Sequence, residues 1–314
     1  MNVSSALRLL AAGGLVACSG NGPPRPDGVA PFPMPNPPAS GLPNPQSYRT
    51  SAEGLVLDEV TGLEWQGGVD RSSTDSSGFT WQDAVDHCDE LEQGGYDDFR
   101  LPNRIELVSI LDPSTTEPAI DEDAFPETPA ETYWTGTSVA SDPELSAYSA
   151  SLVVGDTGSS LKTEERAVRC VRDARQPPLP APGDRFRIEG GTALDRQTGL
   201  RWEHHPTLAA DTLEKARAYC GALIVNGNAN FRVPSVKELQ TIVDDTKTSG
   251  PLLDPVAFPE APGGTYWSST RFAGEPEEPP DGGSPEVLAW SVRFSDGHSR
   301  TEDDDTENRV RCVR

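Results

Sequence analysis

The sequence predicts an α+β protein in which two tandem copies of one disulfide-bridged unit follow a long N-terminal segment. Three observations carry this prediction. Several sequence blocks occur twice, and they occur in the same order both times. Within each copy, residues with helical spacing alternate with short runs of strand-forming residues. Each copy also has two cysteines at matching places.

The duplication is clearest in one nine-residue block, FRLPNRIEL at residues 99–107, which returns as FRVPSVKEL at residues 231–239. Blocks that occur twice in a constant order indicate tandem duplication. The spacing between the copies grows from 132 residues (Cys88 to Cys220) to 142 (Cys170 to Cys312), so copy two has gained ten residues. The other repeated blocks lie, with copy one first, at 57–65 and 194–202, 124–127 and 257–260, 132–138 and 265–270, and 166–172 and 308–314.

Two proline-rich stretches divide the chain. The first has ten prolines between residues 23 and 45 and no hydrophobic periodicity, which favours a semi-rigid polyproline II spacer. The second separates the two copies. We therefore predict five segments: a signal peptide at 1–17, a proline-rich tether at 18–50, domain 1 at 51–174, a proline-rich linker at 175–185 and domain 2 at 186–314.

The N-terminus is typical of an exported protein, because Arg8 precedes an apolar stretch at residues 9–17 that is too short to span a membrane. This stretch ends in LVAC, which resembles a bacterial lipobox. The resemblance implies that Cys18 is lipidated and becomes the first residue of the mature protein, and Ser19 favours the outer membrane. We expect a lipid anchor there, with the protein on the surface or the periplasmic face. The alternative is a plain secretory signal with an incidental cysteine.

Four cysteines remain if Cys18 is lipidated, and they allow three pairings. A unit that was once independent must close its own bridge, so the duplication favours Cys88–Cys170 and Cys220–Cys312. A zinc site is the alternative, but two lone cysteines without nearby histidines or cysteines do not make a zinc shell.

The repeated nine-residue block predicts a strand end that runs into a capped helix. A side-chain oxygen at the N-cap and a glutamate three residues later form a capping box. The repeated Arg100 and Arg232 are left without a role in this joint, and they either join a buried ion pair or contact a ligand. The predicted capping residues are Asn103 and Glu106 in copy one, and Ser235 and Glu238 in copy two.

No catalytic residue and no cofactor is predicted, because known catalytic motifs are absent and none of the four histidines recurs in both copies. His204 and His205 could bind a metal ion weakly, but an exposed pair is the favoured interpretation. The acidic run at 301–308 could supply oxygen ligands to calcium, through Glu302, Asp303, Asp304 and Asp305. It lacks EF-hand spacing, which favours a solvated loop. The formal net charge of −24 excludes nucleic acid as a partner class.

The blocks FRLPNRIEL, TYWTGTS and AVRCVR, together with their second copies, resemble the Lcl C-terminal domain family. The resemblance implies two tandem C-type lectin-like domains, each with two helices beside a small, twisted, mostly antiparallel sheet. It also implies binding modules whose best-known ligands are glycans. The sugar-binding calcium motifs of true C-type lectins are absent here, so no binding residue is carried over.

We therefore expect a non-catalytic envelope lipoprotein that presents two lectin-like modules to a glycan or to an envelope or surface protein. The membrane is its second partner, through Cys18. Candidate contact regions are those in which the copies differ, at residues 66–78, 273–286 and 301–308. The alternatives are a structural or assembly component of the envelope, and an envelope enzyme of the formylglycine-generating type.

Overall fold

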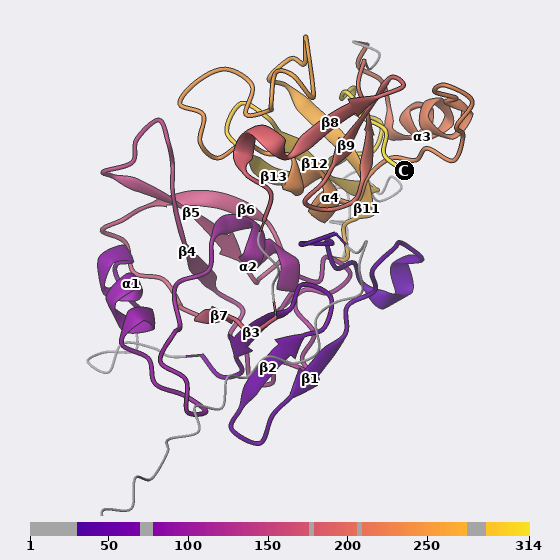
Figure 1. Ribbon diagram of the computed structural model, residues 1–314. Coiled ribbons are helices and arrows are strands. Elements are labelled where there is room, and N and C mark those ends of the chain that lie inside the picture. Colours follow the sequence, from indigo (N-terminus) through magenta and orange to yellow (C-terminus); the bar gives the residue numbers. More distant parts are fainter. Residues whose placement is uncertain (1–29, 70–77, 176–178, 206–208, 275–286) are drawn as a thin grey trace, which may run out of the picture.

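The structure is a computed structural model that describes residues 30–69, 78–175, 179–205, 209–274 and 287–314. The predicted signal peptide, Cys18 and most of two candidate contact regions (70–77 and 275–286) lie outside the described residues. Within the described residues the protein is α+β, and each copy combines two helices with two small antiparallel sheets (Figure 1). No helix in this part of the chain is both long enough and apolar enough to cross a bilayer.

Copy one has a four-stranded sheet, a three-stranded sheet and two helices. The four-stranded sheet has the order β1 (Tyr48–Thr50), β2 (Leu55–Asp58), β3 (Leu63–Gln66) and β7 (Val171–Asp173). The three-stranded sheet has the order β4 (Thr132–Ser138), β5 (Ser146–Ser151) and β6 (Thr157–Leu161). The two helices are α1 (Trp81–Asp89) and α2 (Arg104–Ile110).

Copy two repeats this arrangement with one difference. Val313 forms only single-residue bridges, with Trp202 and Arg232, at the place where copy one has β7. Its first sheet has the order β10 (Arg201–Glu203), β9 (Thr192–Asp195) and β8 (Phe186–Glu189). Its second sheet has the order β11 (Thr265–Arg271), β12 (Leu288–Arg293) and β13 (His298–Asp303). Its helices are α3 (Leu213–Ala222) and α4 (Val236–Thr241).

Both predicted disulfides are present in the structure. Cys88 on α1 is bonded to Cys170, and Cys220 on α3 is bonded to Cys312. All four cysteines are fully buried, and each pair lies in an apolar cluster. Each bridge therefore ties the first helix of its copy to the last segment of that copy.

The repeated nine-residue block is confirmed as a capped strand-to-helix joint. Both capping boxes are complete, with Asn103 and Ser235 as the N-caps. The repeated arginine extends this joint, because Arg100 donates to both carboxylate oxygens of Glu106 at 2.7 and 2.8 Å. Arg232 makes the same bidentate pair with its own capping glutamate at 2.6 Å. The ion-pair interpretation of the arginines is thus correct in both copies.

Two further repeated blocks meet in one buried contact. Arg169, from the VRCVR block, donates to the carbonyl oxygen of Gln66 at 2.7 Å and lies 4.8 Å from the ring centroid of Phe125 in the AFPE block. In copy two, Arg311 lies 4.8 Å from the ring centroid of Phe258 and donates to the backbone at the end of β10. A buried cation above an aromatic ring, held by carbonyl oxygens, explains why both blocks recur. These blocks are framework.

The second half of the predicted tether is not a free spacer. Residues 30–47, here called the arm, pack against both copies. Phe32 and Met34 are buried in the main core of copy one. The backbone N–H of Phe32 donates to the Gln197 carbonyl at 2.8 Å, and the hydroxyl of Ser235 donates to Asn36 Oδ1 at 2.8 Å, both in copy two. This proline-rich segment contains two large apolar side chains, Phe32 and Met34, at alternate positions, and their burial holds the arm against the protein.

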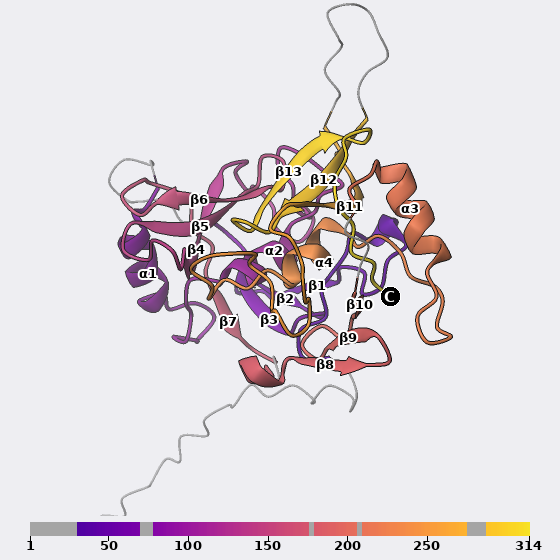
Figure 2. The ribbon, with the colours of Figure 1, turned by 90° about the horizontal axis from the view of Figure 1, so that it is seen from above.

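The two copies contact each other through residues at matching positions. The backbone N–H of Thr157 donates to Ser299 Oγ at 2.8 Å, and the N–H of Ser299 donates to Thr157 Oγ1 at 3.1 Å. These residues occupy matching positions, so the contact is reciprocal, as in an isologous interface. Helices α2 and α4 pack side by side near this contact (Figure 2).

Lys237 breaks this symmetry, because its fully buried amine contacts the other copy. Its Nζ donates to the carbonyl oxygens of Ser109 and Leu111, at 2.8 and 2.7 Å, at the end of α2. Burial lowers the pKa of Lys237 to about 7, although the carboxylates of Asp112 and Asp58 oppose this shift. A neutral amine still has enough N–H donors for both carbonyls.

This burial predicts a pH dependence of stability. Between pH 7 and the ordinary lysine value of 10.5, the unfolded chain binds a proton that the folded chain has lost. The free energy of unfolding should therefore rise as the pH rises through this window. Urea denaturation at pH 7, 8 and 9 should show the rise, and Lys237→Met should flatten it. An equal slope in the variant would show that Lys237 is not its source.

Candidate functional site

A pocket of about 580 Å³ lies where the arm, the loop after α2 and copy two meet. One side is formed by residues 37–42 of the arm and by Pro113 and Ser114 of copy one. The other side is formed by α3, the strand-to-helix joint of copy two and the end of β11. Binding pockets commonly form between domains, and this volume is in the range that such pockets have.

The walls of the pocket are mostly apolar. The apolar lining residues are Pro37 and Leu42 of the arm, Phe231 and Val233 of the repeated joint, and Pro113 of copy one. Phe231 and Val233 are buried, since they also belong to the apolar cluster around Cys220–Cys312. The framework of copy two therefore provides a fixed apolar floor.

The hydroxyl groups of the lining are largely used inside the protein. Each of the four serine hydroxyls donates a hydrogen bond to a nearby protein oxygen, and the Thr270 hydroxyl accepts one from the Val236 N–H. The serine acceptors are Pro37 O for Ser40, Asp112 Oδ1 for Ser114, Asn36 Oδ1 for Ser235 and Pro234 O for Ser269. The principal polar groups left for a ligand are therefore guanidinium groups.

Three arginines line the pocket, and two of them are paired. Arg232 is bonded to Glu238, and Arg271 lies 3.0 Å from Asp304. Arg217, on α3, is exposed and donates to the Ser269 carbonyl at 3.3 Å. Among the described residues it has no carboxylate partner within ion-pair distance. Of the three guanidinium groups, Arg217 alone has no carboxylate partner among the described residues, although further carboxylates lie near the lining: Asp303 and Asp305 beside Asp304, and Asp112 bonded to Ser114.

The surroundings of the Arg217 guanidinium group, which is partly desolvated although the residue as a whole is exposed, disfavour its positive charge. Burial lowers the pKa of Arg217, and the positive charge of Arg271 lowers it further, although Asp304 opposes the shift. The guanidinium group remains charged at neutral pH. Two neighbouring cations that repel each other would both be stabilised by an anionic group between them.

The charge of this pocket belongs to copy two alone. Arg217 matches Val85 in copy one, and Arg271 matches Ser138. In copy one, Ser138 Oγ accepts a hydrogen bond from Lys162 Nζ at 2.8 Å, and that amine lies 3.6 Å from the ring centroid of Trp81. Sequence reasoning missed Arg217 and Arg271 because it compared loops of different length. Point differences inside aligned elements were the signal that could have found them.

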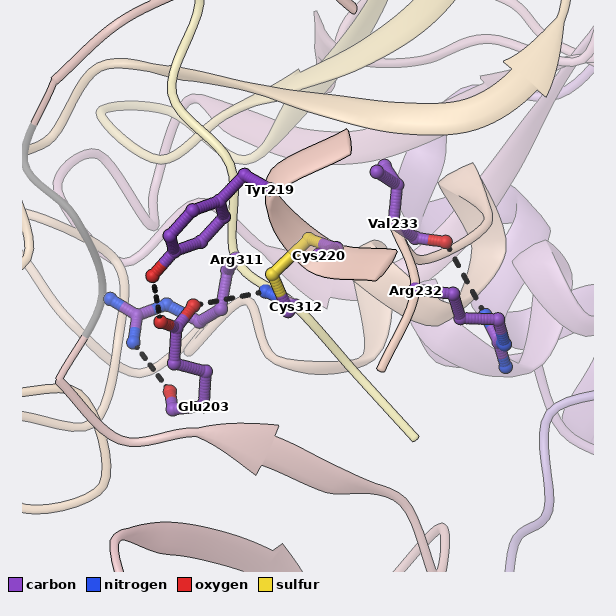
Figure 3. The surroundings of a disulfide bond; sticks show 7 residues. All are labelled: Glu203, Tyr219, Cys220, Arg232, Val233, Arg311 and Cys312. Atoms are coloured by element: carbon purple, nitrogen blue, oxygen red, sulfur yellow. Dashed lines mark hydrogen bonds between the residues drawn. A yellow bond between two sulfur atoms is a disulfide. The ribbon is translucent and has the colours of Figure 1, made fainter. Parts of the chain in front are cut away.

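Figure 3 shows the surroundings of the Cys220–Cys312 bridge in copy two. Glu203 is buried there, and it accepts hydrogen bonds from the Tyr219 hydroxyl and, at 3.4 Å, from the Cys312 N–H. Burial raises the pKa of Glu203, whereas these hydrogen bonds and Arg311 oppose the shift. Gln66 makes the corresponding bond to Cys170 at 3.3 Å. The matching amide in copy one indicates that this position has a structural role.

The residues considered as calcium ligands are brought together only in part. The carboxylates of Asp303, Asp304 and Asp305 lie within 4.8 Å of one another. Residues 301–303 belong to β13, so the loop interpretation is wrong for the start of this acidic run, which pairs with β12. Asp304 is paired with Arg271, and Glu302 accepts from Asn308. Part of the acidic charge is thus already balanced by protein groups.

His204 and His205 have adjacent rings, with 4.2 Å between the ring centroids. His204 Nδ1 lies 2.9 Å from the Ala257 carbonyl oxygen, so that nitrogen carries a proton and donates. His205 is exposed, whereas His204 is partly buried.

Comparison with known sequences agrees with the duplication. No curated protein matches the sequence of this chain. The family model of the Lcl C-terminal domain matches twice, at residues 54–172 and 191–314. These matches cover both copies and most of the chain. The chain belongs to the Lcl C-terminal domain family, and it carries two copies of that domain in tandem.

Proposed function

We propose that this protein is a lipid-anchored recognition protein of the bacterial outer membrane, which binds a partner in the pocket of copy two. The two domains have a C-type lectin-like fold, and they act as a binding scaffold rather than as a catalyst. The observation that carries the proposal is the pocket itself, which combines apolar walls with guanidinium groups on a duplicated framework.

The scaffold supports this role because the repeated residues are used for stability. The Ser235–Glu238 capping box, the bidentate Arg232–Glu238 pair and the Cys220–Cys312 disulfide hold the joint that forms the pocket floor. A rigid pocket floor improves binding because the protein loses less conformational freedom on association. Recognition then depends on the residues by which copy two differs from copy one.

The pocket chemistry favours a protein partner over a glycan. A sugar presents several hydroxyl groups, and its recognition needs side chains that both donate and accept hydrogen bonds. The pocket lining contains no aspartate, glutamate, asparagine or glutamine side chain among its described residues, and its serine hydroxyls already donate elsewhere. Apolar groups and charge-assisted contacts are the interactions that remain.

Filling the pocket tests this proposal. Gly221 lines it, and a Cβ at that position would meet no atom within 4 Å. Gly221→Trp should therefore fill the pocket without disturbing α3, and it should abolish binding. Gly221→Ala is the matched control, which should keep binding and raise the free energy of unfolding by about 0.5 kcal/mol through helix propensity.

The assay is binding to arrays of envelope proteins and of glycans, with calcium and with a chelator. Bound partners should be retained by Gly221→Ala and lost by Gly221→Trp. If the Gly221→Trp variant binds a partner as tightly as the unchanged protein does, the recognition site lies outside this pocket. Binding that requires calcium and tolerates the tryptophan would direct attention to residues 303–305 instead.

A further inference from the structure

We propose that the pocket of copy two binds the C-terminal end of a partner protein that finishes in an apolar residue, with Arg217 holding the terminal carboxylate. This inference rests on the proposed function, and it names the chemistry of the ligand. The carboxylate would bind at the arginine wall, and the last side chain would lie between the arm and the joint of copy two.

The case for a carboxylate begins with Arg217. A guanidinium group has five N–H donors in a planar fork that matches the two oxygens of a carboxylate. The hydrogen bond from Arg217 to the Ser269 carbonyl oxygen uses one of its terminal nitrogens. Among the described residues no carboxylate is paired with it, and Arg271 stands near enough to lower its pKa. A ligand carboxylate would complete this arrangement.

The number of unpaired cations indicates one anionic group rather than many. Among the described lining residues only Arg217 lacks a carboxylate partner, and Asp303 and Asp305 lie beside the Asp304 that pairs with Arg271. The rest of the protein is strongly acidic and would repel a polyanion such as a sulfated glycan. A peptide terminus places one negative charge inside the pocket while the remainder of the partner lies outside it.

The rest of the ligand must be apolar where it is buried. Pro37, Leu42, Pro113, Phe231 and Val233 form its surroundings, and the serine hydroxyls donate within the protein. Burying a sugar hydroxyl against these walls would leave it without partners, which costs about 1–3 kcal/mol for each group. Burying an aliphatic or aromatic side chain there is favourable.

Copy one gives an internal comparison. Its matching positions hold Val85, Asp89 and Ser138 in place of Arg217, Gly221 and Arg271. It thus has an acid where copy two has open space, and no arginine at either cationic position. The cation beside Ser138 in copy one is Lys162, whose amine is already bonded to Ser138 and Pro143 and lies over the Trp81 ring, so copy two is better equipped to bind a carboxylate.

The test uses the full chain with Cys18→Ser, which removes the predicted lipid. A library of hexapeptides with free C-terminal carboxylates and randomised last three positions should yield binders that end in apolar residues. Amidation of the selected peptide should weaken binding at least about tenfold, because a charge-assisted pair is lost. Arg217→Val, which installs the copy-one residue, should have a similar effect. Arg187→Gln, at an exposed arginine outside the pocket, should bind like the parent chain.

Several results would overturn the inference. Equal binding of the acid and the amide, or full binding by Arg217→Val, would remove the carboxylate from recognition. Absence of any binder at millimolar peptide would exclude peptide termini, and tighter binding of decanoate than of every peptide would assign the pocket to fatty acids. In these cases a partner that is lost in Gly221→Trp would still support the proposed function. That function itself fails only if partners tolerate the tryptophan.

Discussion

Replacing Cys220 and Cys312 together with alanine is expected to lower the free energy of unfolding of copy two by about 4.5 kcal/mol. The bridge joins residues 92 positions apart, so its loss releases a large loop in the unfolded chain. Both sulfur atoms lie in a fully buried cluster with Phe231, which is also the floor of the pocket. Binding in the pocket should therefore be lost with the bridge.

Urea denaturation gives the stability, and the copy-one pair provides a matched comparison. Cys88 and Cys170 are separated by 82 residues, so their replacement should cost a nearly equal free energy, also about 4.5 kcal/mol. Binding in the pocket should be reduced less by replacing Cys88 and Cys170 than by replacing Cys220 and Cys312. A loss below about 1 kcal/mol for either pair, or a Cys88–Cys220 peptide under non-reducing conditions, would contradict this account.

Arg104→Ala is expected to destabilise the contact between the copies by about 3 kcal/mol. Arg104 is buried on α2, and its Nε donates to Asp245 at 2.7 Å in copy two. Its terminal nitrogens donate to the carbonyl oxygen of Gln240 at 3.0 Å and to the Gln240 side chain. Alanine would leave the buried oxygens of Gln240 and the partly buried carboxylate of Asp245 without their donor, which is a large cost in a closed interface.

Hydrogen exchange is the sharpest readout for Arg104, because the interface can open without unfolding either copy. The amides of Thr157 and Ser299, which bond reciprocally across the interface, should exchange faster in the variant. Arg49→Ala is the control, since the ion pair that Arg49 forms with Glu59 is exposed, and its loss should change stability by less than about 1 kcal/mol. Unchanged exchange at both interface amides would show that Arg104 does not hold the copies together.

The duplicated framework was predictable from the sequence because its constraints are local or internal to one copy. Capping by Asn103 and Ser235 depends on neighbours three residues away. The disulfide pairing followed from requiring each copy to close its own bridge. The helical spacing of apolar residues at 81–91 and 213–223 indicates a helix in each copy, and these helices are observed as α1 and α3, which end slightly earlier.

The packing of the arm was not predictable, because its composition indicates an extended spacer whereas two of its side chains are buried. A proline-rich segment without periodicity is typical of a spacer, yet Phe32 and Met34 are buried in the core of copy one. Single large side chains between prolines are too few to produce a periodic pattern. Only the tertiary structure reveals that they have a core to enter.

The pocket was predictable only in principle. Its floor residues Phe231 and Val233 belong to the repeated block and were interpreted as framework, which they are. Its cationic residues Arg217 and Arg271 lie on a helix and at a strand end, where single charged residues are usually solvated. In the structure both arginines line a pocket that the arm completes, and no sequence pattern predicts the position of the arm.

Mapping backbone amide chemical shifts on the Cys18→Ser chain tests the central claim, which is that recognition belongs to copy two alone. With a free-carboxylate peptide, amides at Arg217, Gly221 and residues 269–271 should shift. The matching amides of copy one, at Val85, Asp89 and residues 136–138, should not shift. Shifts confined to the copy-one positions or to residues 301–308, with the pocket amides unmoved, would contradict the assignment of recognition to this pocket.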